Sequence, residues 1–249
     1  MKRIITLFAI IVLSHFSAFS QDKYEMVIEK KDGSEIAVNT EDIQRIYFRE
    51  RNNGGGSGTS YLTCPDANHP HMIDLGLPSG TKWACCNVGA TTPEGHGNYY
   101  AWGETQSKNT YDWNTYKYGN SDDDVVNIGS DIAGTSYDAA TANWGAEWHM
   151  PTIQQCIELI RNTTSEVKIQ NGVKGRLFTG SNGGSIFLPF GGSYRAAHLY
   201  DSGSMGYYWS STIDGGSPYM ARILAVISTK AYTGDSNGRE YGLSVRPVQ

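Results

Sequence analysis

Six short segments in the C-terminal half of this sequence alternate between apolar and polar residues. Such alternation, with a period of two, is typical of β-strands that bury one face. The segments are residues 167–170, 175–179, 185–189, 207–213, 221–228 and 241–247. Glycine-rich and polar turn residues separate them, so the pattern predicts short antiparallel strands. A further strand is expected earlier in the chain, at residues 82–88.

Two segments before this run have helical character. They are "DAATANWG", residues 138–145, and "MPTIQQCIELIRN", residues 150–162, in which Thr152 is a suitable N-cap. In the second segment four residues share one helical face: Ile153, Cys156, Ile157 and Ile160. Helices followed by a run of short strands predict an α+β domain.

The first 20 residues have the pattern of a secretory signal peptide. Lys2 and Arg3 precede a mostly apolar run at residues 4–13, and a small-x-small signal at residues 18–20 precedes Gln21. We therefore expect export, with the mature protein in the periplasm, at the cell surface or outside the cell.

Residues 21–50 have the pattern of a small β unit, and residues 51–60 have the composition of a linker. In the first segment, apolar residues alternate on both sides of Asp32-Gly33, a dipeptide typical of a hairpin turn, and a third strand is expected at Ile46 and Phe48. This β leader unit is smaller than the roughly 40 residues that a lone core needs, so we expect it to dock or self-associate. The second segment, "RNNGGGSGTS", predicts a flexible linker, which leaves residues 61–249 as the main domain.

The charge and hydropathy of the chain exclude two classes of partner. The formal net charge is −5 and no basic cluster stands out, which argues against nucleic-acid binding. No segment after the signal approaches the roughly 18 consecutive apolar residues of a transmembrane helix, so no membrane span is expected.

The cysteines allow several arrangements. The chain has four: Cys64, Cys85, Cys86 and Cys156. Export favours disulfides over metal binding, and four cysteines allow three pairings. A bond between the neighbours Cys85 and Cys86 is strained, so two pairings remain. One or more cysteines can also stay free and buried.

The usual catalytic and metal-binding signatures are missing or incomplete. "GLPSGTK", residues 76–82, lacks the spacing and the following helix of a phosphate loop. Residues 121–131 lack the alternating ligands and central glycine of a calcium loop. Cys64, His69 and His71 are zinc-type residues that lie close in sequence, but a surface or structural role is favoured. We therefore expect no metal, no cofactor and no catalytic residue.

Glu104 carries the alternative, enzymatic interpretation. It lies among aromatic residues in "YYAWGET", where a carboxyl group with a raised pKa could act as an acid. A carboxylate that accepts backbone N–H groups in a tight loop is the favoured interpretation. No second acid is evidently paired with Glu104, and Asp112 and Glu94 are candidates only by their proximity in sequence.

Six ordered motifs carry a family resemblance. They are "IDLGLPSGTKWACCNVGA", "GNYYAWGET", "ANWGAEWHMPT", "SIFLPFGGSYR", "GYYWSST" and "YGLSVRPV". Together they resemble the Fibrobacter succinogenes major paralogous domain family and its relatives in secreted Bacteroidota proteins. The resemblance covers residues 71–248, and the β leader unit resembles short leaders found before such domains.

The resemblance implies a C-type-lectin-like fold more than an activity. Copper-dependent formylglycine-generating enzymes, which share this broad fold, need a late cysteine pair, and no cysteine follows Cys156. The Glu-Pro-Asn and Gln-Pro-Asp tripeptides of calcium-dependent lectins are also missing. His149 stands where relatives more often have arginine, which puts any salt bridge of that arginine in doubt.

In lectin-like folds of this type, the last third of the domain forms the ligand face. Alternation in "GYYWSST" predicts that Tyr207 and Trp209 face the core and that Tyr208 faces a ligand. Tyrosine and arginine offer a large contact area with polar tips, as binding hot spots do. The candidate ligand-binding residues are Tyr194, Arg195, Tyr200, Tyr208, Tyr219, Tyr232, Arg239 and Tyr241.

These observations predict a secreted, non-enzymatic ligand-binding or adhesion module. Its ligand is expected to be a glycan or a surface protein. The alternatives are a hydrolase-type enzyme that uses Glu104 and a structural envelope component whose β leader unit mediates assembly.

Overall fold

A computed structural model describes residues 25–29, 35–39 and 71–249 of the chain. The chain divides into two units, Met1–Gly54 and Gly55–Gln249, and the division falls within the expected linker. Each unit is described by itself. The expected signal peptide, the third leader strand and the cysteine Cys64 lie outside the described residues.

In the first unit the expected hairpin strands are present. Strand β1 (Glu25–Glu29) pairs antiparallel with β2 (Glu35–Asn39), with Met26 opposite Val38 and Ile28 opposite Ile36. The register therefore aligns the apolar residues of the two strands, as the alternation predicted.

The second unit contains both expected helices. Helix α1 (Ala139–Trp144) begins at Asp138, whose carboxylate accepts the backbone N–H groups of Ala140 and Thr141. Helix α2 (Ile153–Asn162) begins at Thr152 with a complete capping box. A capping box satisfies N–H groups that would otherwise lack an intrahelical partner.

Neither of these helices is long and apolar enough to cross a membrane, and the described residues contain no other helix that is.

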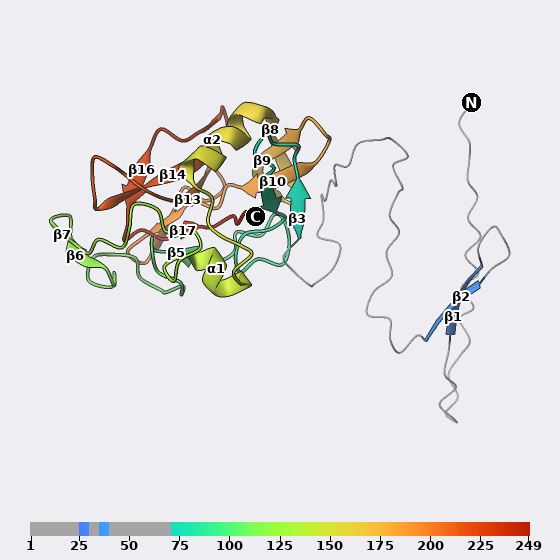
Figure 1. The fold of residues 1–249 in the computed structure, drawn as a ribbon, viewed down its shortest axis with the longest axis horizontal. Helices are drawn as coiled ribbons and strands as arrows, with labels where there is room; N and C mark the ends of the chain where they lie inside the picture. Colours follow the sequence, from blue (N-terminus) through green and yellow to red (C-terminus); the bar gives the residue numbers. More distant parts are fainter. Residues whose placement is uncertain (1–24, 30–34, 40–70) are drawn as a thin grey trace, which may run out of the picture. The chain divides into compact units, whose positions relative to one another are not determined.

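A central sheet organises the second unit (Figure 1). Its strand order is β15-β14-β13-β17-β5, and β16 pairs with β14 beside β15. The strands are β5 (Tyr99–Tyr100), β13 (Met205–Ile213), β14 (Met220–Ile227), β15 (Ala231–Tyr232), β16 (Ser236–Gly238) and β17 (Leu243–Ser244).

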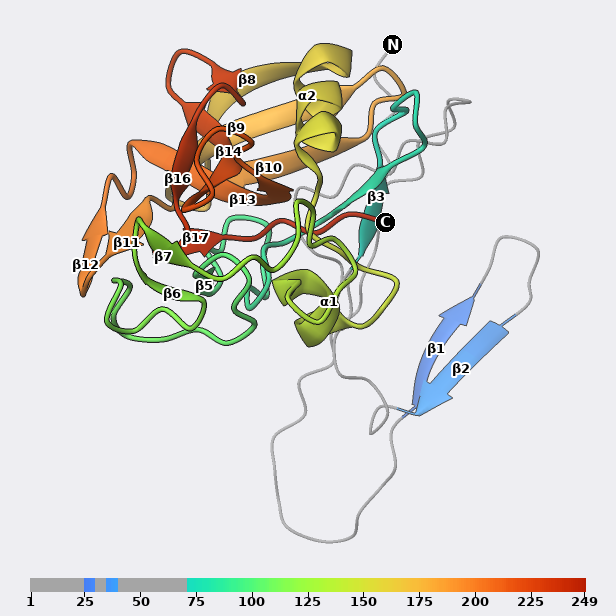
Figure 2. The ribbon, with the colours of Figure 1, turned by 60° about the vertical axis from the view of Figure 1, so that its left-hand side comes forward.

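A three-stranded antiparallel sheet and three strand pairs complete this unit (Figure 2). The sheet consists of β8 (Thr163–Gln170), β9 (Val173–Gly180) and β10 (Ser185–Pro189). The pairs are β3 (Met72–Asp74) with β4 (Lys82–Ala84), β6 (Gly119–Ser121) with β7 (Asp124–Val125), and β11 (Ser193–Arg195) with β12 (His198–Tyr200).

Strands β13 and β14 are buried on both faces. On one face Tyr208, Leu224 and Val226 pack with α2 and β10 in one core cluster. On the other face Trp209 and Ile223 belong to a second cluster that includes the first-turn alanines of α1. The core of this unit therefore lies on both sides of the central strand pair.

The described fold consists mainly of strands with two helices, which is consistent with an α+β or a mainly-β domain. Two expected strands are shorter than predicted. Residues 82–88 contain only the three-residue β4, and residues 241–247 contain only the two-residue β17. After β17 the chain does not continue as a regular strand. The backbone N–H of Ala84 donates a hydrogen bond to the Pro247 carbonyl oxygen, but Pro247 has no backbone N–H with which to form a second hydrogen bond.

Helix α2 buries a slightly different face from the one predicted. Ile153, Cys156 and Leu159 are buried, whereas Ile157 and Ile160 are partly buried against the same cluster. Burial raises the pKa of the Cys156 thiol, which therefore stays protonated in the core. Cys85 and Cys86 are also buried in this cluster.

Candidate functional site

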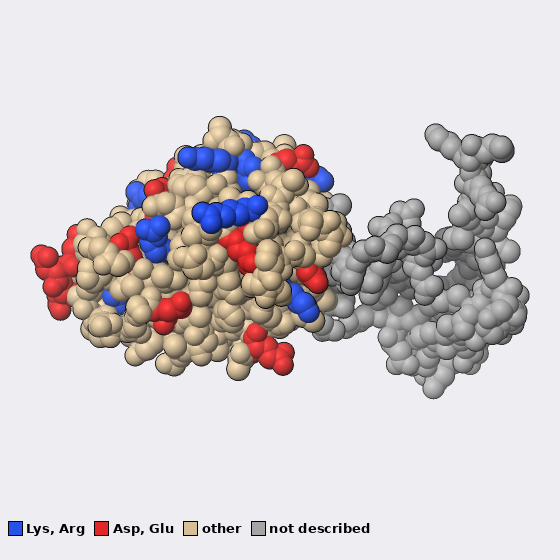
Figure 3. Space-filling view, turned by 45° about the horizontal axis from the view of Figure 1, so that its top comes forward, with Lys and Arg blue, Asp and Glu red and all other residues tan. Residues whose placement is uncertain are grey.

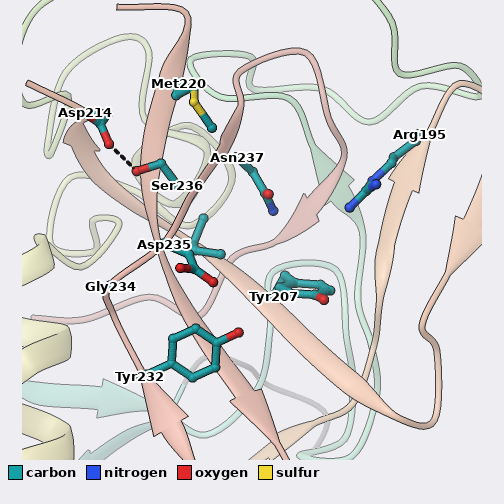
Figure 4. A pocket seen from close by; sticks show the side chains of 10 residues that line it. Arg195, Tyr207, Asp214, Met220, Tyr232, Gly234, Asp235, Ser236 and Asn237 are labelled. Atoms are coloured by element: carbon teal, nitrogen blue, oxygen red, sulfur yellow. Dashed lines mark hydrogen bonds between the residues drawn. The ribbon is translucent and has the colours of Figure 1, made fainter. Parts of the chain in front are cut away.

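A concave pocket of about 430 Å³ lies over the outer part of the central sheet (Figure 4). The lining residues all come from the segment 195–237, and most of their side chains are polar or aromatic. The lining residues are Arg195, Tyr207, Asp214, Met220, Ile223, Tyr232, Gly234, Asp235, Ser236 and Asn237.

Strand pairing positions the lining residues of β14, β15 and β16. Strand β16 pairs with the start of β14, with Asn237 opposite Ala221 and Ser236 opposite Arg222. Strand β15 pairs with the end of β14, with Tyr232 opposite Ala225. The turn between β15 and β16 therefore closes one side of the pocket with Gly234 and Asp235.

The β11–β12 hairpin positions Arg195. The backbone of Ala196 exchanges two hydrogen bonds with Tyr111, of 2.8 and 2.9 Å, and that of Tyr194 exchanges two with Gly242, of 2.8 and 3.0 Å. The backbone on each side of Arg195 is therefore fixed by a pair of hydrogen bonds. Its guanidinium carbon lies 4.9 Å from the ring centre of Tyr241 and 5.8 Å from that of Tyr200. Such cation–π contacts orient the side chain while leaving its N–H groups available.

Asp214 is engaged within the protein. Its carboxylate accepts hydrogen bonds from the Ser236 hydroxyl and from the N–H of Gly216, and lies 3.6 Å from a guanidinium nitrogen of Arg222. These hydrogen bonds and the Arg222 charge hold the pKa of Asp214 below its usual value. Asp214 therefore stays ionised and fixes Ser236 at the wall of the pocket.

Two half-buried tyrosines line the pocket. Burial, with a contribution from Asp201, raises the pKa of Tyr207 to about 12, and its hydroxyl donates to Asp201 at 3.3 Å. Burial and the neighbouring Asp235 also raise the pKa of Tyr232. Both phenols are therefore neutral at physiological pH and present ring surface and hydroxyl groups.

Two of the predicted ligand-binding residues are buried, and for these the prediction was wrong. Tyr208 is 1% exposed, because α2 and β10 cover the face of β13 that alternation assigned to solvent. Arg239 is fully buried. Its guanidinium donates to Tyr116, Val126 and Pro218, and so ties separate loops together.

The other predicted residues have different surroundings. Arg195 and Tyr232 line the pocket, and Tyr200 and Tyr241 contact Arg195. Tyr194 instead packs in an aromatic cluster, with ring centres 4.8 Å from Tyr99 and 5.6 Å from Tyr111. Tyr219 is half-buried and accepts the Arg239 N–H through its backbone carbonyl.

Sequence reasoning missed part of the lining. The alternation assigned both Tyr207 and Trp209 to the core. Trp209 is fully buried, which confirms the prediction for this residue, whereas Tyr207 is only half-buried. Asp235 and Ser236 also went unpredicted. The turn sequence Gly234-Asp235, next to a tyrosine and an asparagine, was the available signal.

Glu240 is a buried acid close to the pocket. It is 7% exposed, and its Oε2 atom has no hydrogen-bond partner among the described residues. Burial raises its pKa to about 7, with Asp122 and Asp112 adding to the rise and Arg195 opposing it. Glu240 does not line the pocket, but it interacts electrostatically with Arg195.

The Glu104 carboxylate is buried and hydrogen-bonded within the protein. It is 2% exposed and accepts hydrogen bonds from the Lys117 N–H at 2.8 Å and the Lys108 ammonium at 3.0 Å. A carboxylate held by a backbone amide is what the favoured interpretation expected. The Glu94 carboxylate accepts hydrogen bonds from the side-chain amides of Gln170 and Asn171.

In the part of the chain that the structure describes, no three His, Cys, Asp or Glu side chains are arranged to hold a metal ion. His71 lies near Cys85, with 3.7 Å between Nδ1 and Sγ, while His69 and Cys64 lie outside that part. The Nδ1 atom of His149 lies 2.9 Å from the Met150 carbonyl oxygen.

On the face in Figure 3, Lys and Arg side chains lie among Asp and Glu side chains, and a group of acidic side chains gathers at its left end.

Comparisons of the chain with protein-family models, with curated proteins and with solved structures find no match.

Proposed function

We propose that this protein is an exported, non-enzymatic binding module that takes a carbohydrate in the pocket around Tyr207 and Tyr232. The resemblance of its motifs to the major paralogous domain family, and hence to a C-type-lectin-like fold, is part of this proposal. Export rests on the signal-peptide pattern of residues 1–20.

One observation carries the proposal: a concave site combines two half-buried tyrosines with polar side chains. Tyr207 and Tyr232 offer ring faces to a sugar, while Asp235, Ser236 and Asn237 offer hydrogen-bonding groups around them. A few positioned polar groups within an aromatic pocket are typical of small-ligand sites. A volume of about 430 Å³ accommodates one or two sugar units.

The hydrolase alternative has less support. Glycoside hydrolysis ordinarily needs two carboxyl groups that flank the scissile bond. Two carboxyl groups line the pocket, but Asp214 is already bound by Ser236 and Arg222, which leaves only Asp235 in this lining. Glu104 is buried and bound to Lys108, and Glu240 is outside the pocket lining. A structural envelope role does not use the pocket, so a binding screen separates it from the proposal.

The test is a glycan array probed with the full exported chain, with calcium and with chelator. We expect a hit that is independent of calcium and that Tyr207→Ala and Tyr232→Ala each weaken at least tenfold. Tyr118→Ala is the matched control, because Tyr118 is a partly buried tyrosine that packs on Tyr137 outside the pocket. No hit on the array, or equal loss in all three variants, would refute the proposal.

A further inference from the structure

Arg195 has an available guanidinium group. Its side chain is exposed, and within the described residues it makes no hydrogen bond or ion pair. The rings of Tyr241 and Tyr200 nevertheless restrict it, at 4.9 and 5.8 Å from its guanidinium carbon. An oriented guanidinium with free N–H groups matches the two oxygens of a carboxylate.

Asn237 supplies a second donor in the same pocket. Its Nδ2 atom is buried and has no hydrogen-bond partner among the described residues. Buried polar groups are nearly always paired, so this donor in the pocket wall is available to an acceptor that enters the pocket. Figure 4 shows the Arg195 and Asn237 side chains extending toward the space around the Tyr207 ring.

The two acidic side chains of the lining, Asp214 and Asp235, lie on the side of the pocket away from Arg195 (Figure 4). Asp214 is already bound by Ser236 and Arg222. Asp235 is exposed and points toward the side of Tyr232, away from Arg195, in Figure 4. The pocket therefore has a donor end at Arg195 and Asn237, and an acceptor end at Asp235.

We propose that the pocket selects an acidic sugar, a hexuronate unit of a glycan, whose carboxylate binds Arg195 and Asn237. The sugar hydroxyls then donate to Asp235, and the ring lies against Tyr207. This inference rests on the proposed carbohydrate-binding function and adds the charge of the ligand to it.

The experiment compares three matched probes by calorimetry: an oligogalacturonide, its methyl ester, and the neutral galactose oligomer of equal length. The methyl ester keeps the shape of the uronate and removes its charge. We expect the acidic probe to bind at least tenfold more tightly than either neutral one. Arg195→Gln should remove that difference, and Arg195→Lys should restore only part of it, because an ammonium group lacks the two-pronged geometry.

Lys230→Gln is the matched control. Lys230 also lies over a tyrosine ring, 4.9 Å from the centre of Tyr232, but does not line the pocket. Its loss should leave the preference for the acidic probe unchanged. An equal loss of preference in Arg195→Gln and Lys230→Gln would show nonspecific attraction and overturn the inference.

The remaining outcomes separate this inference from the function on which it rests. Tyr207-dependent binding of neutral glycans, with no preference for the acidic probe, would overturn the inference and leave the carbohydrate-binding function intact. Absence of glycan binding of any charge, on the array and by calorimetry, would overturn both.

Discussion

The Tyr208 hydroxyl donates a 2.6 Å hydrogen bond to the carbonyl oxygen of Pro189, at the end of β10. This bond joins the central sheet to the three-stranded sheet through the core. It shows that Tyr208 connects two layers of the fold and does not face solvent.

Tyr208→Phe should therefore lower the stability of the protein without changing the pocket, because Tyr208 does not line it. The ring stays in the core, but one buried hydrogen bond is lost, which costs about 0.5–1.5 kcal/mol of the free energy of unfolding. The Gly191 N–H still donates to Pro189, so the carbonyl keeps a partner. Urea unfolding measures the loss, and glycan affinity should be unchanged. Wild-type stability together with weakened binding would contradict the core position of this residue.

Trp209→Ala should destabilise the protein far more. Trp209 is fully buried, and its indole N–H donates to the Tyr100 carbonyl at 2.7 Å. Truncation of a buried aromatic residue to alanine costs about 3–5 kcal/mol, because it leaves a cavity. Thermal unfolding of the variant measures this cost. A change below about 1 kcal/mol would mean that the neighbouring side chains refill the site.

The two positions show how far alternation along a strand can be trusted. A period of two predicted the strand correctly, and it predicted that Trp209 is buried. It failed for Tyr208 because a strand covered on both faces has no solvent side. Helix α2 and strand β10, which cover that face, come from elsewhere in the chain, and local pattern carries no information about them.

Only some of the pocket residues could be predicted from the sequence, again because distant parts of the chain determine the contacts. Arg195 and Tyr232 were expected at a ligand face because of their chemistry and their place in the last third of the chain. The partners of Arg195 depend on the pairing of Tyr194 with Gly242, which joins positions 48 residues apart. The helix start at Thr152, in contrast, depends on neighbours three residues away and was predicted correctly.

The two arginines of the predicted ligand face should differ strongly in how much stability is lost when each is replaced by lysine. Arg239 donates to three different loops and lies 4.9 Å from the Trp102 ring centre, so Arg239→Lys should lower stability by about 2–4 kcal/mol. Arg195→Lys, at an exposed position, should change stability by less than about 0.5 kcal/mol. Parallel urea titrations measure both values. Similar losses in the two variants would show that Arg195 also has a structural role.

Glu240 should make stability depend on pH. Its pKa rises from the ordinary 4.5 to about 7 in the folded protein, mainly because it is buried. Between these values the folded protein binds a proton that the unfolded chain has released. Stability should therefore fall as the pH rises through this window, by about 1–3 kcal/mol in all, and level off above it.

The matched variant is Glu240→Gln, which keeps the shape of the side chain and cannot ionise. Its free energy of unfolding should lack this fall, so the difference between variant and wild type grows from pH 5 to pH 8. Taking the difference cancels the titration of other groups, such as His96, whose pKa burial lowers. Because ionised Glu240 also opposes the charge of Arg195, wild-type affinity for the acidic probe should weaken over the same pH range, and that of Glu240→Gln should not. Parallel stability profiles for the two proteins would show that Glu240 is already ionised at pH 5.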